Sequence, residues 1–400
     1  MAQGRSTRVD RPASGTAPPV VLLSHGFQAE YEVAFANGLA QRGVPVTVVG
    51  ADGTLVDRLE PGVEFLNLRG SQHAGRRVWQ KLLNIARYWF AYLRLARRRP
   101  EAVFHFNGLF TLRKGLGVWV EAWLAHRFIP RWWLSVHNLM PHDGDTPLHR
   151  WIFSRVYSWP DRLVVHTEAM RAALHAEFGI ALDRILVIEH GIDQFHPPLP
   201  GDREALCRHL GLPADGAQLL LMFGHLSPYK GADVLLQSVV RAGLPAGVRL
   251  LLVGRIGSAD YRARLVAACA AMGEAAQRVH LIDRFVPDAE VPLLLRGSAA
   301  MLLPYRHIDQ SGALFAARSA GLPVLATDVG SFAQYLEPGR DVLVPACTED
   351  DLARGLQELV RQLDPEDRLQ SVQAARRWAW RATLAPYEQA LTAARSEARA

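Results

Sequence analysis

The chain has 400 residues, of which 49% are hydrophobic and 21% are charged, and its formal net charge is +6. This length suits two domains of about 200 residues each, and the composition is that of a globular protein and excludes a disordered one. No apolar run approaches the roughly 20 residues that span a bilayer, so we expect no membrane-spanning helix. The cysteines lie far apart without metal-binding spacing, which predicts free thiols in a reducing, cytoplasmic compartment: Cys207, Cys269 and Cys347.

Residues 1–18 contain proline, glycine, serine and arginine but no apolar stretch, which predicts a disordered tail rather than a signal peptide or an anchor. From there on, short apolar runs alternate with amphipathic segments, the first of which is a predicted helix over 30–42. This alternation is typical of a parallel sheet covered by helices on both faces. Strands are predicted at 18–26, 44–50, 103–107, 131–138, 162–167 and 184–191.

The segment 194–202, QFHPPLPGD, interrupts this pattern with three prolines and a glycine and is the predicted linker. Six further strands are then predicted, at 218–224, 248–254, 278–285, 299–305, 322–327 and 341–345. The fold class is therefore α/β, with two Rossmann-like, doubly wound parallel sheets facing a cleft into which both point their ligand-binding loops. The expected parts are domains at 19–196 and 203–375 and a helical, aromatic segment at 376–400 that returns to the first domain.

The first phosphate-binding signal is the sequence FGHLSPYKGADVLL at 223–236. A strand is predicted to end at Gly224, and a helix starts near Gly231 after a loop. Glycines let the backbone approach a phosphate closely, and a helix N-terminus supplies free N–H groups and a positive dipole. Lys230 is the only lysine after residue 114 in a chain with 42 arginines, which favours a compact point charge at this position. The alternative is a surface lysine at a helix start.

The second signal lies in YRHIDQSGALFAARSAGLPVLATDVGS at 305–331. A strand ends at Tyr305, a polar loop carries Gln310, Ser311 and Gly312, and a helix is predicted over 313–320. Two such helix starts that point into one cleft suit a diphosphate better than a single phosphate. The alternative is that Ser311 caps the helix without any ligand.

The order of these motifs resembles that in the C-terminal domain of family-4 retaining glycosyltransferases, which have the GT-B fold. The first group is a strand, the motif G-x-L-x-x-x-K-G and a helix. The second group is P-Y, S-G, a helix and G-L-P-V-x-A-T-D-V-G. HGIDQFHP at 190–197 resembles the interdomain segment of that family, and 380–387 resembles its closing helix. The resemblance extends over about residues 19–390. It implies that the first domain binds the acceptor and the second binds the sugar nucleotide.

By this resemblance Lys230 neutralises the donor diphosphate, and His225 lies where many relatives have an arginine. The paired glutamates of the family fall here at Ile308 and Ala316, and a further glutamate falls at Gln334. The chain instead resembles a branch with a Q-S-G loop, and no residue is assigned to the ribose hydroxyls. The likeness assigns donor binding to Gly224, His225, Lys230, Gly231, Gln310, Ser311, Gly312 and Ala313.

On the acceptor side, SVHNLMPHDGD at 135–145 follows a predicted strand, and His137 matches the histidine that lies beside the transferred sugar in relatives. The alternative is a histidine that fastens its own loop. The predicted acceptor residues are Gly26, His137 and Asn138, and the predicted catalytic residues are His137, Lys230 and Ser311. The sequence DGD at 143–145 resembles a metal-binding D-x-D, but we interpret it as a turn, and the resemblance implies that no metal or cofactor is needed.

The resemblance implies that a hexose moves from a UDP- or GDP-linked sugar to a saccharide or lipid-linked acceptor with retention of anomeric configuration. Bacterial cell-surface or exopolysaccharide synthesis is the expected setting. The leaving phosphate can accept the proton of the acceptor, so no strong protein base is required. Three alternatives are a nucleotide-sugar epimerase, an inverting transferase and a non-catalytic GT-B binding partner. No nucleic-acid module is recognisable, so nucleic acid is not expected as a partner.

The stretch 76–99, RRVWQKLLNIARYWFAYLRLARRR, combines basic and aromatic residues at helical spacing. It lies between Glu64 and Glu101, an interval with nine basic residues and no acidic one. The predicted apolar face consists of Val78, Leu82, Ile85, Trp89, Leu93 and Ala96, widened by Trp79, Leu83 and Phe90. Such a helix can lie on anionic lipid, which would place a cytoplasmic enzyme at the inner face of the cell membrane. The alternative is a core-packing helix with a solvated basic face.

Overall fold

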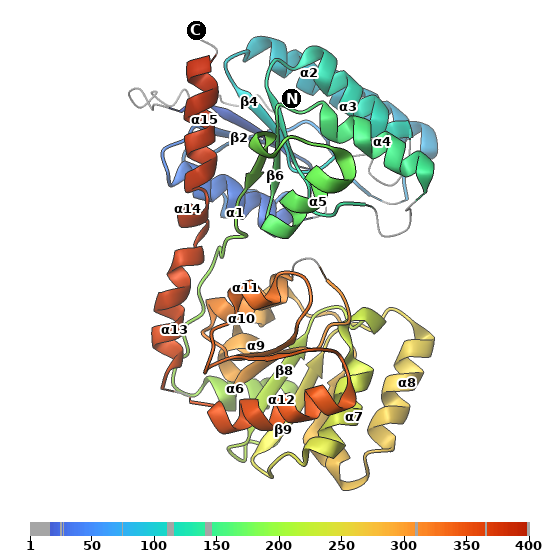
Figure 1. Ribbon diagram of the computed structural model, residues 1–400, viewed down its shortest axis with the longest axis vertical. Coiled ribbons are helices and arrows are strands. Elements are labelled where there is room, and N and C mark those ends of the chain that lie inside the picture. Colours follow the sequence, from blue (N-terminus) through green and yellow to red (C-terminus); the bar gives the residue numbers. More distant parts are fainter. Residues whose placement is uncertain are drawn as a thin grey trace, which may run out of the picture. The chain divides into compact units, whose positions relative to one another are not determined.

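The computed structural model describes residues 17–24, 26, 28–73, 75–109, 116–140, 146–308, 311–364 and 366–397. The predicted disordered tail lies almost wholly outside these described residues. The chain divides into two compact units, of which unit 1 is Met1–Gly191 with Trp378–Ala400 and unit 2 is Ile192–Arg377. Figure 1 shows that each unit is a parallel sheet with helices on both faces, as the sequence predicts.

The sheet of unit 1 has seven parallel strands in the order β3-β2-β1-β4-β5-β6-β7. Its central strands are buried on both faces, and this is why they consist of nearly continuous apolar residues. The strands are β1 (Val20–Leu23), β2 (Val46–Gly50), β3 (Glu64–Asn67), β4 (Val103–Phe106), β5 (Trp132–Ser135), β6 (Arg162–Val165) and β7 (Ile185–Val187).

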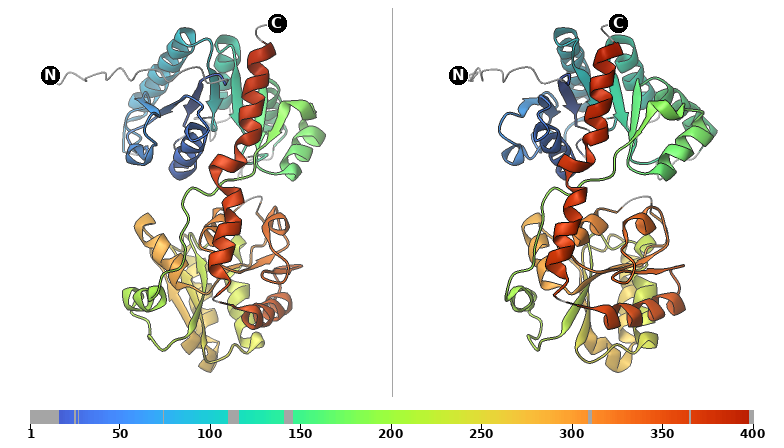
Figure 2. Two further views of the ribbon diagram at one scale, coloured as in Figure 1. Left: turned by 90° about the vertical axis from the view of Figure 1, so that its left-hand side faces the viewer. Right: turned by 60° about the vertical axis from the view of Figure 1, so that its left-hand side comes forward.

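Two helical layers cover this sheet. One face packs against α2 (Val78–Arg98), α3 (Leu116–Phe128), α4 (Pro147–Ser158) and α5 (Glu168–Phe178). The other face packs against α1 (Ala29–Ala40) and two helices from the end of the chain, α14 (Trp380–Thr383) and α15 (Ala385–Glu397). Figure 2 shows these last two helices in red beside the sheet of unit 1.

Two details of unit 1 differ from the sequence prediction. Strand β3 was not predicted, because it is an edge strand whose first and last residues, Glu64 and Asn67, are exposed and polar. The single helix expected over 376–394 is divided into the 3-10 turn η6 (Arg376–Trp378), α14 and α15. Pro386 at the start of α15 explains the break, because proline has no N–H to donate and its ring clashes with the preceding turn.

The sheet of unit 2 has six parallel strands in the order β10-β9-β8-β11-β12-β13. All six coincide with predicted apolar runs. They are β8 (Gln218–Phe223), β9 (Val248–Val253), β10 (Val279–Ile282), β11 (Ala300–Leu303), β12 (Val324–Thr327) and β13 (Val342–Val344). One face packs against α7 (Ala232–Ala242), α8 (Ala259–Ala270) and α12 (Glu349–Gln362). The other carries α6 (Asp202–Leu210), α9 (Val291–Gly297), α10 (Gly312–Ser319) and α13 (Arg368–Ala375).

The strand order of each sheet reverses direction once, between β1 and β4 in unit 1 and between β8 and β11 in unit 2. In doubly wound sheets, ligands bind beyond the carboxyl ends of the strands at such a switch point. Both predicted phosphate-binding loops of unit 2 begin there, because one follows β8 and the other follows β11.

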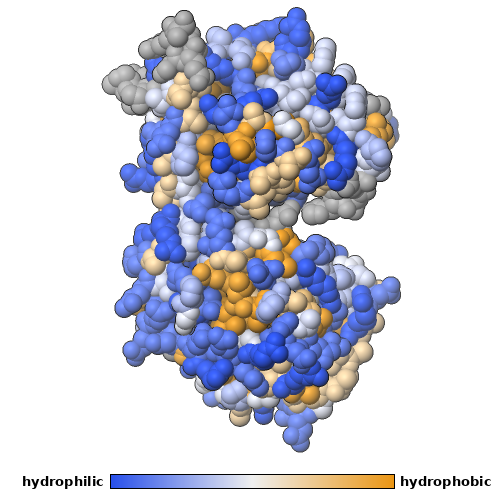
Figure 3. Space-filling view, viewed as in Figure 1, coloured by the Kyte–Doolittle hydropathy of each residue, from blue (hydrophilic) through white to orange (hydrophobic). Residues whose placement is uncertain are grey.

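Among the described residues, no helix is both long enough and apolar enough to cross a bilayer. The face of the molecule seen in Figure 3 is mostly hydrophilic, with hydrophobic areas of limited extent.

The closing helices are part of the core of unit 1 through two aromatic side chains. Trp380 is 3% exposed and packs against Tyr31 and Phe35 of α1. Tyr387 is fully buried, and its hydroxyl lies 2.9 Å from Nδ1 of His105 on β4. The packing of both rings in one core gives a physical reason for the spacing between Trp380 and Tyr387.

We predict that Trp380→Ala lowers the free energy of unfolding of unit 1 by about 3–5 kcal/mol, because a large buried ring is replaced by a cavity. Urea denaturation followed by circular dichroism measures the change. The matched control is Trp151→Ala on α4, where the ring is 53% exposed and the expected change is within about 0.5 kcal/mol. Equal stabilities of the two variants would show that α14 is not part of the core.

Candidate functional site

The most unusual charged group of unit 2 is the ammonium of Lys230, at the end of the 3-10 turn η3 (Pro228–Lys230) that precedes α7. The residue is 9% exposed, and none of the described carboxylates forms an ion pair with it. Its Nζ lies 5.5 Å from the centroid of the Tyr305 ring. Burial lowers the pKa of Lys230 from 10.5 to about 8, so the ammonium is still charged at neutral pH. A buried cation without an ion pair is costly by itself, which makes this position a candidate anion-binding site.

Glycines shape the space around this ammonium. Gly224, directly after β8, has φ +97°, and a Cβ atom on it would lie 3.2 Å from Nζ of Lys230. Gly231 has φ +73°, and a Cβ there would lie 2.0 Å from the carbonyl oxygen of Pro304. Both positions therefore require glycine for conformation, and Gly231 also for close packing of the α7 start against the end of β11.

Two further glycines, which the sequence analysis did not single out, follow β9. Gly254 has φ +157°, and a Cβ on it would lie 1.7 Å from the carbonyl oxygen of Gly224. A Cβ on Gly257 would lie 2.8 Å from the ring of His225. These residues let the β9 loop pass directly beside the β8 loop. His225 is itself exposed, and its ring lies against the β9 loop.

The second predicted loop meets the first at Tyr305. The Tyr305 side chain is buried and forms a hydrogen bond with Ser311, the N-cap residue of α10. Burial raises the pKa of Tyr305, so its hydroxyl stays protonated. Lys230 and Ser311 thus both contact Tyr305, one at its ring and the other at its hydroxyl. The structure in this way brings together the two helix starts that the sequence singled out.

The start of α10 keeps its hydrogen-bonding groups available. The Ser311 side chain makes no capping hydrogen bond, and Gly312 is exposed at the first helical position. The first N–H groups of a helix have no partner within the helix, so the amides of Gly312 and Ala313 are suited to bind an anion. Gln310, the remaining predicted donor residue, lies outside the described residues.

A polar network holds the η3 turn in place. Arg306, after β11, forms an ion pair with Asp233 at 2.9 Å, and its amide N–H donates to the carbonyl oxygen of Tyr229 at 2.7 Å. The Tyr261 hydroxyl donates to the same Asp233 carboxylate at 3.1 Å. These contacts fix the position of Lys230 and yet leave its ammonium without a carboxylate partner.

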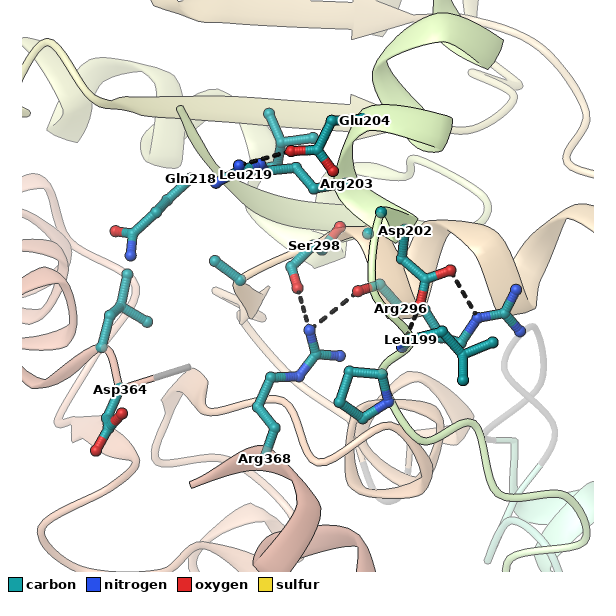
Figure 4. Close-up of a pocket in the computed structure, with 15 residues that line it drawn as sticks. Leu199, Asp202, Arg203, Glu204, Gln218, Leu219, Arg296, Ser298, Asp364 and Arg368 are labelled. Atoms are coloured by element: carbon teal, nitrogen blue, oxygen red, sulfur yellow. Dashed lines mark hydrogen bonds and ion pairs between the residues drawn. The ribbon is translucent and has the colours of Figure 1, made fainter. Parts of the chain in front are cut away.

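A separate pocket of about 220 Å³ lies at the opposite edge of this sheet, where β8 begins at Gln218 (Figure 4). Three of its arginines have partners within the fold. Arg296 lies 3.2 Å from Asp202, and Arg203 lies 2.7 Å from Glu204. Arg368 donates to backbone carbonyl oxygens, including that of Ser298 at 2.9 Å. The edge with Lys230 is the better candidate site, because it is the carboxyl edge of the strands, where ligands bind in doubly wound sheets.

In unit 1, the predicted residue His137 follows β5 at the carboxyl edge of the sheet. Its Nε2–H donates to the carbonyl oxygen of Asn107, after β4, at 3.1 Å. The contact joins the ends of two neighbouring strands. Asn138 is exposed. The structure thus places these two predicted residues at the edge where acceptor binding is expected.

Two residues near His137 were missed by the sequence analysis. The side-chain amide of Asn107 is fully buried, and no described residue forms a hydrogen bond with it. His166, after β6, donates from Nδ1 to the carbonyl oxygen of Ile188 at 2.8 Å, and its Nε2 has no described partner. Burial lowers the pKa of His166 to about 4, so the ring is neutral at pH 7. The Tyr31 ring lies 5.0 Å from that of His137 and 5.4 Å from that of His166.

Gly26, the third predicted acceptor residue, has φ +78°. Its N–H lies 3.1 Å from both the hydroxyl of Ser24 and the carboxylate of Glu32. A Cβ on Gly26 would lie 2.8 Å from the guanidinium of Arg69, a buried residue that donates to the carbonyl oxygen of Ser24 at 2.7 Å. Arg69 thus fills the space that the missing side chain leaves.

The described residues contain no cluster of three or more histidine, cysteine or acidic side chains placed to hold a metal ion. The DGD sequence at 143–145 lies outside the described residues.

Comparison with solved structures defines the class of protein. The chain resembles HepE of Anabaena in complex with UDP, with a TM-score of 0.69 at 17% identity, over 94% of this chain and all of that one. It also resembles sucrose-phosphate synthase of Thermosynechococcus elongatus, with a TM-score of 0.68 at 18% identity, over 96% of this chain and all of that one. At these identities the likeness establishes the fold, which is GT-B.

Sequence relatives define the family. The family "Glycosyltransferase Family 4" matches residues 28–194, and "Glycosyl transferases group 1" matches residues 217–362. A D-inositol 3-phosphate glycosyltransferase of Rhodococcus erythropolis is 30% identical over 361 residues, which cover 82% of this chain and 77% of that one. A 2-deoxystreptamine glucosyltransferase of Streptomyces kanamyceticus is 27% identical over 252 residues, or 61% of each chain.

The chain therefore belongs to glycosyltransferase family 4. It is a glycosyltransferase that uses a nucleotide-sugar donor.

The buried ammonium gives a test that does not depend on any ligand. A pKa of about 8 in place of 10.5 corresponds to about 3 kcal/mol of free energy against folding at neutral pH. We predict that Lys230→Met, which keeps the length of the side chain, raises the free energy of unfolding by about 1–3 kcal/mol at pH 7. Between pH 8 and 10.5 the folded wild type binds fewer protons than its unfolded chain, so its stability rises with pH and the advantage of the variant shrinks.

Chemical denaturation at pH 7 and pH 10 measures both effects. Lys81→Met, at a partly exposed lysine of unit 1, is the control and should change stability by no more than about 0.5 kcal/mol. A destabilised Lys230→Met protein at pH 7 would show that the ammonium is already compensated within the fold.

Proposed function

We propose that this enzyme transfers a hexose from a UDP- or GDP-linked sugar to a saccharide or polyprenyl-linked acceptor with retention of configuration. The proposed setting is synthesis of bacterial cell-surface polysaccharide at the inner face of the cell membrane. One observation supports the donor part most directly. The unpaired Lys230 ammonium and the start of α10 meet at Tyr305, at the switch point of unit 2. A diphosphate carries the charge and the acceptor oxygens that such a site lacks.

We assign donor binding to the loop after β8 and to the start of α10. Lys230 supplies the compact charge, and Ser311 supplies a hydroxyl beside the amides of Gly312 and Ala313. Family 4 carries paired glutamates in this region, but the corresponding positions here are Ile308 and Ala316. In the proposed branch the Q-S-G loop takes over donor contact, with Gln310 and Ser311 as its polar side chains.

In the proposed reaction the bond between the anomeric carbon and the diphosphate oxygen breaks, and the acceptor oxygen forms its bond on the same face. Negative charge grows on the departing diphosphate, where Lys230 and the helix-start amides stabilise it. The acceptor proton passes to the leaving phosphate oxygen, so atoms and charges balance without a protein base. His137, with Asn138 and Gly26 at the same edge of unit 1, is assigned to the acceptor and the transferred sugar.

A second acceptor class is favoured by the names of the relatives. They include D-inositol 3-phosphate and 2-deoxystreptamine glycosyltransferases, whose acceptors are polyhydroxylated six-membered carbocycles. A small cyclitol is therefore the second candidate acceptor for this chain. Parallel assays with inositol 3-phosphate and with a polyprenyl-linked saccharide extract distinguish the two classes.

We predict that UDP or GDP raises the melting temperature of the wild type, because a ligand that binds only the folded state stabilises it. Lys230→Met should weaken nucleotide diphosphate binding by at least about tenfold, the lower end of the range for a hydrogen bond to a charged group. Because binding of an anion raises the pKa of Lys230, titration calorimetry at pH 8–9 should show proton uptake in the wild type and none in the variant. Lys81→Met should behave as the wild type. Unchanged affinity in Lys230→Met would refute the assignment.

We predict that the product keeps the anomeric configuration of the donor. Proton NMR of the glycosidic linkage, formed from a donor that gives turnover, reads the configuration directly. An inverted anomer would require a protein base and would exclude the mechanism above. Release of an isomerised sugar without acceptor would instead identify an epimerase, and nucleotide binding with no turnover on any acceptor would identify a binding partner.

A further inference from the structure

Residues 78–90 of α2 carry large apolar side chains that are mostly exposed in unit 1. Five of them are exposed, with fractions from 52% for Leu83 to 72% for Val78. No other described helix or strand carries more than two exposed side chains of this kind. Together they define the α2 apolar stripe, which consists of Val78, Trp79, Leu82, Leu83 and Phe90.

The predicted apolar face of this helix divides between the two alternatives: Trp89, Leu93 and Ala96 pack in the core of unit 1, whereas Val78 and Leu82 are exposed. Contact with the core is made from the second half of α2 instead, where Tyr88, Tyr92 and Ala96 are buried. Val78 and Leu82 are four residues apart, as are Trp79 and Leu83, and Phe90 follows Leu83 by seven residues, so the stripe lies on one side of the helix. The first half of α2 therefore presents an apolar side that the fold does not use.

A row of arginines borders the stripe. Arg87, Arg94 and Arg98 are all exposed. Arg87 lies four residues after Leu83, and Arg94 and Arg98 lie four and eight residues after Phe90. They therefore follow the edge of the stripe along the helix. No acidic residue occurs on α2 or anywhere between Glu64 and Glu101. Two further arginines nearby have partners inside unit 1, since Arg97 stacks on the Phe128 ring and Arg99 pairs with Glu64.

We infer that the α2 apolar stripe and its arginine row dock on an anionic lipid bilayer, with the helix lying in the plane of the interface. A helix with an apolar side that includes tryptophan and phenylalanine, bordered by cations, has the composition of an interfacial helix. Each arginine near an anionic surface adds attraction that salt weakens.

The length of α2 supports the same occupant. Its 21 residues extend about 31 Å, and the stripe covers more than half of this length. The helix lies side by side with α3 and α4 on one face of the sheet (Figure 1), so an in-plane orientation is held by the packing of unit 1. This inference does not rest on the proposed acceptor, because it is argued only from the exposed side chains of α2.

Flotation of the purified full-length protein with vesicles tests the inference. One set of vesicles is pure phosphatidylcholine, and the other contains about one third phosphatidylglycerol, an anionic lipid. The wild type should float with the anionic vesicles, less so at high salt, and weakly with the neutral ones. Trp79→Ser/Leu83→Ser/Phe90→Ser should lose at least about tenfold in partitioning on both, because the inserted apolar area is gone. Arg87→Glu/Arg94→Glu/Arg98→Glu should lose the preference for anionic lipid.

The matched control is Val240→Ser/Val266→Ser/Leu369→Ser, three exposed apolar side chains of unit 2, which should float as the wild type does. All replaced residues are exposed, and melting temperatures check that each variant is folded. The shift in melting temperature on adding UDP should be the same in all proteins, which separates failure of this inference from failure of the donor site. Equal flotation of the wild type and the serine variant of the stripe would overturn the inference. Absence of wild-type flotation, with a dimer that the serine variant converts to monomer, would overturn it in favour of contact between copies of the chain.

Discussion

The candidate site of unit 2 depends on one unfavourable interaction, the burial of the Lys230 ammonium with no counter-ion among the described residues. The neighbouring residues hold that charge in place. Arg306 and Asp233 fix the turn that carries the lysine, and Gly231 allows α7 to start directly against the end of β11. Tyr305 offers its ring face to the cation and its hydroxyl to Ser311. The fold thus keeps a buried positive charge in place in the free protein, at some cost to its own stability.

Unit 1 is organised around a different constraint, which is that the end of the chain completes its core. Trp380 and Tyr387 occupy the same face of the sheet as α1, and a Cβ on Gly191 would lie 2.3 Å from the Trp380 ring. Gly191 is therefore a glycine because of a residue nearly two hundred positions later in the chain. Fully buried histidine side chains on this face carry no charge at neutral pH. His105 is an example, because burial lowers its pKa to about 3. Such a setting suits recognition of neutral hydroxyl groups better than of a phosphate.

Much of this architecture could be predicted from the sequence, because buried parallel strands are continuous apolar runs and their loops carry glycine and polar residues. The strands of unit 2 and the two loops at its switch point were found in this way, whereas β3 was missed because an exposed edge strand has no such signal. Roles that arise only from tertiary contact could not be predicted. Gly254 is required by the carbonyl group of Gly224, and no local pattern reports that contact. The extent of core contact along α2 could not be predicted for a related reason, since helical periodicity shows that a helix is amphipathic but not which of its turns reach the core.

The use of lysine at position 230 follows from how this chain uses its arginines. Buried arginines here are held by acceptors inside the fold. Arg318 forms an ion pair with Asp341, and Arg368 donates to four backbone carbonyl oxygens. A guanidinium has five N–H donors in a fixed plane, so a buried arginine needs several acceptors at once and becomes part of the structure. An ammonium has three rotatable donors and a pKa that burial can lower, so it can stay in place with few internal partners until an anion arrives. In a chain with 42 arginines and three lysines, Lys230 is the one placed at the switch point of unit 2, where no described carboxylate pairs with it.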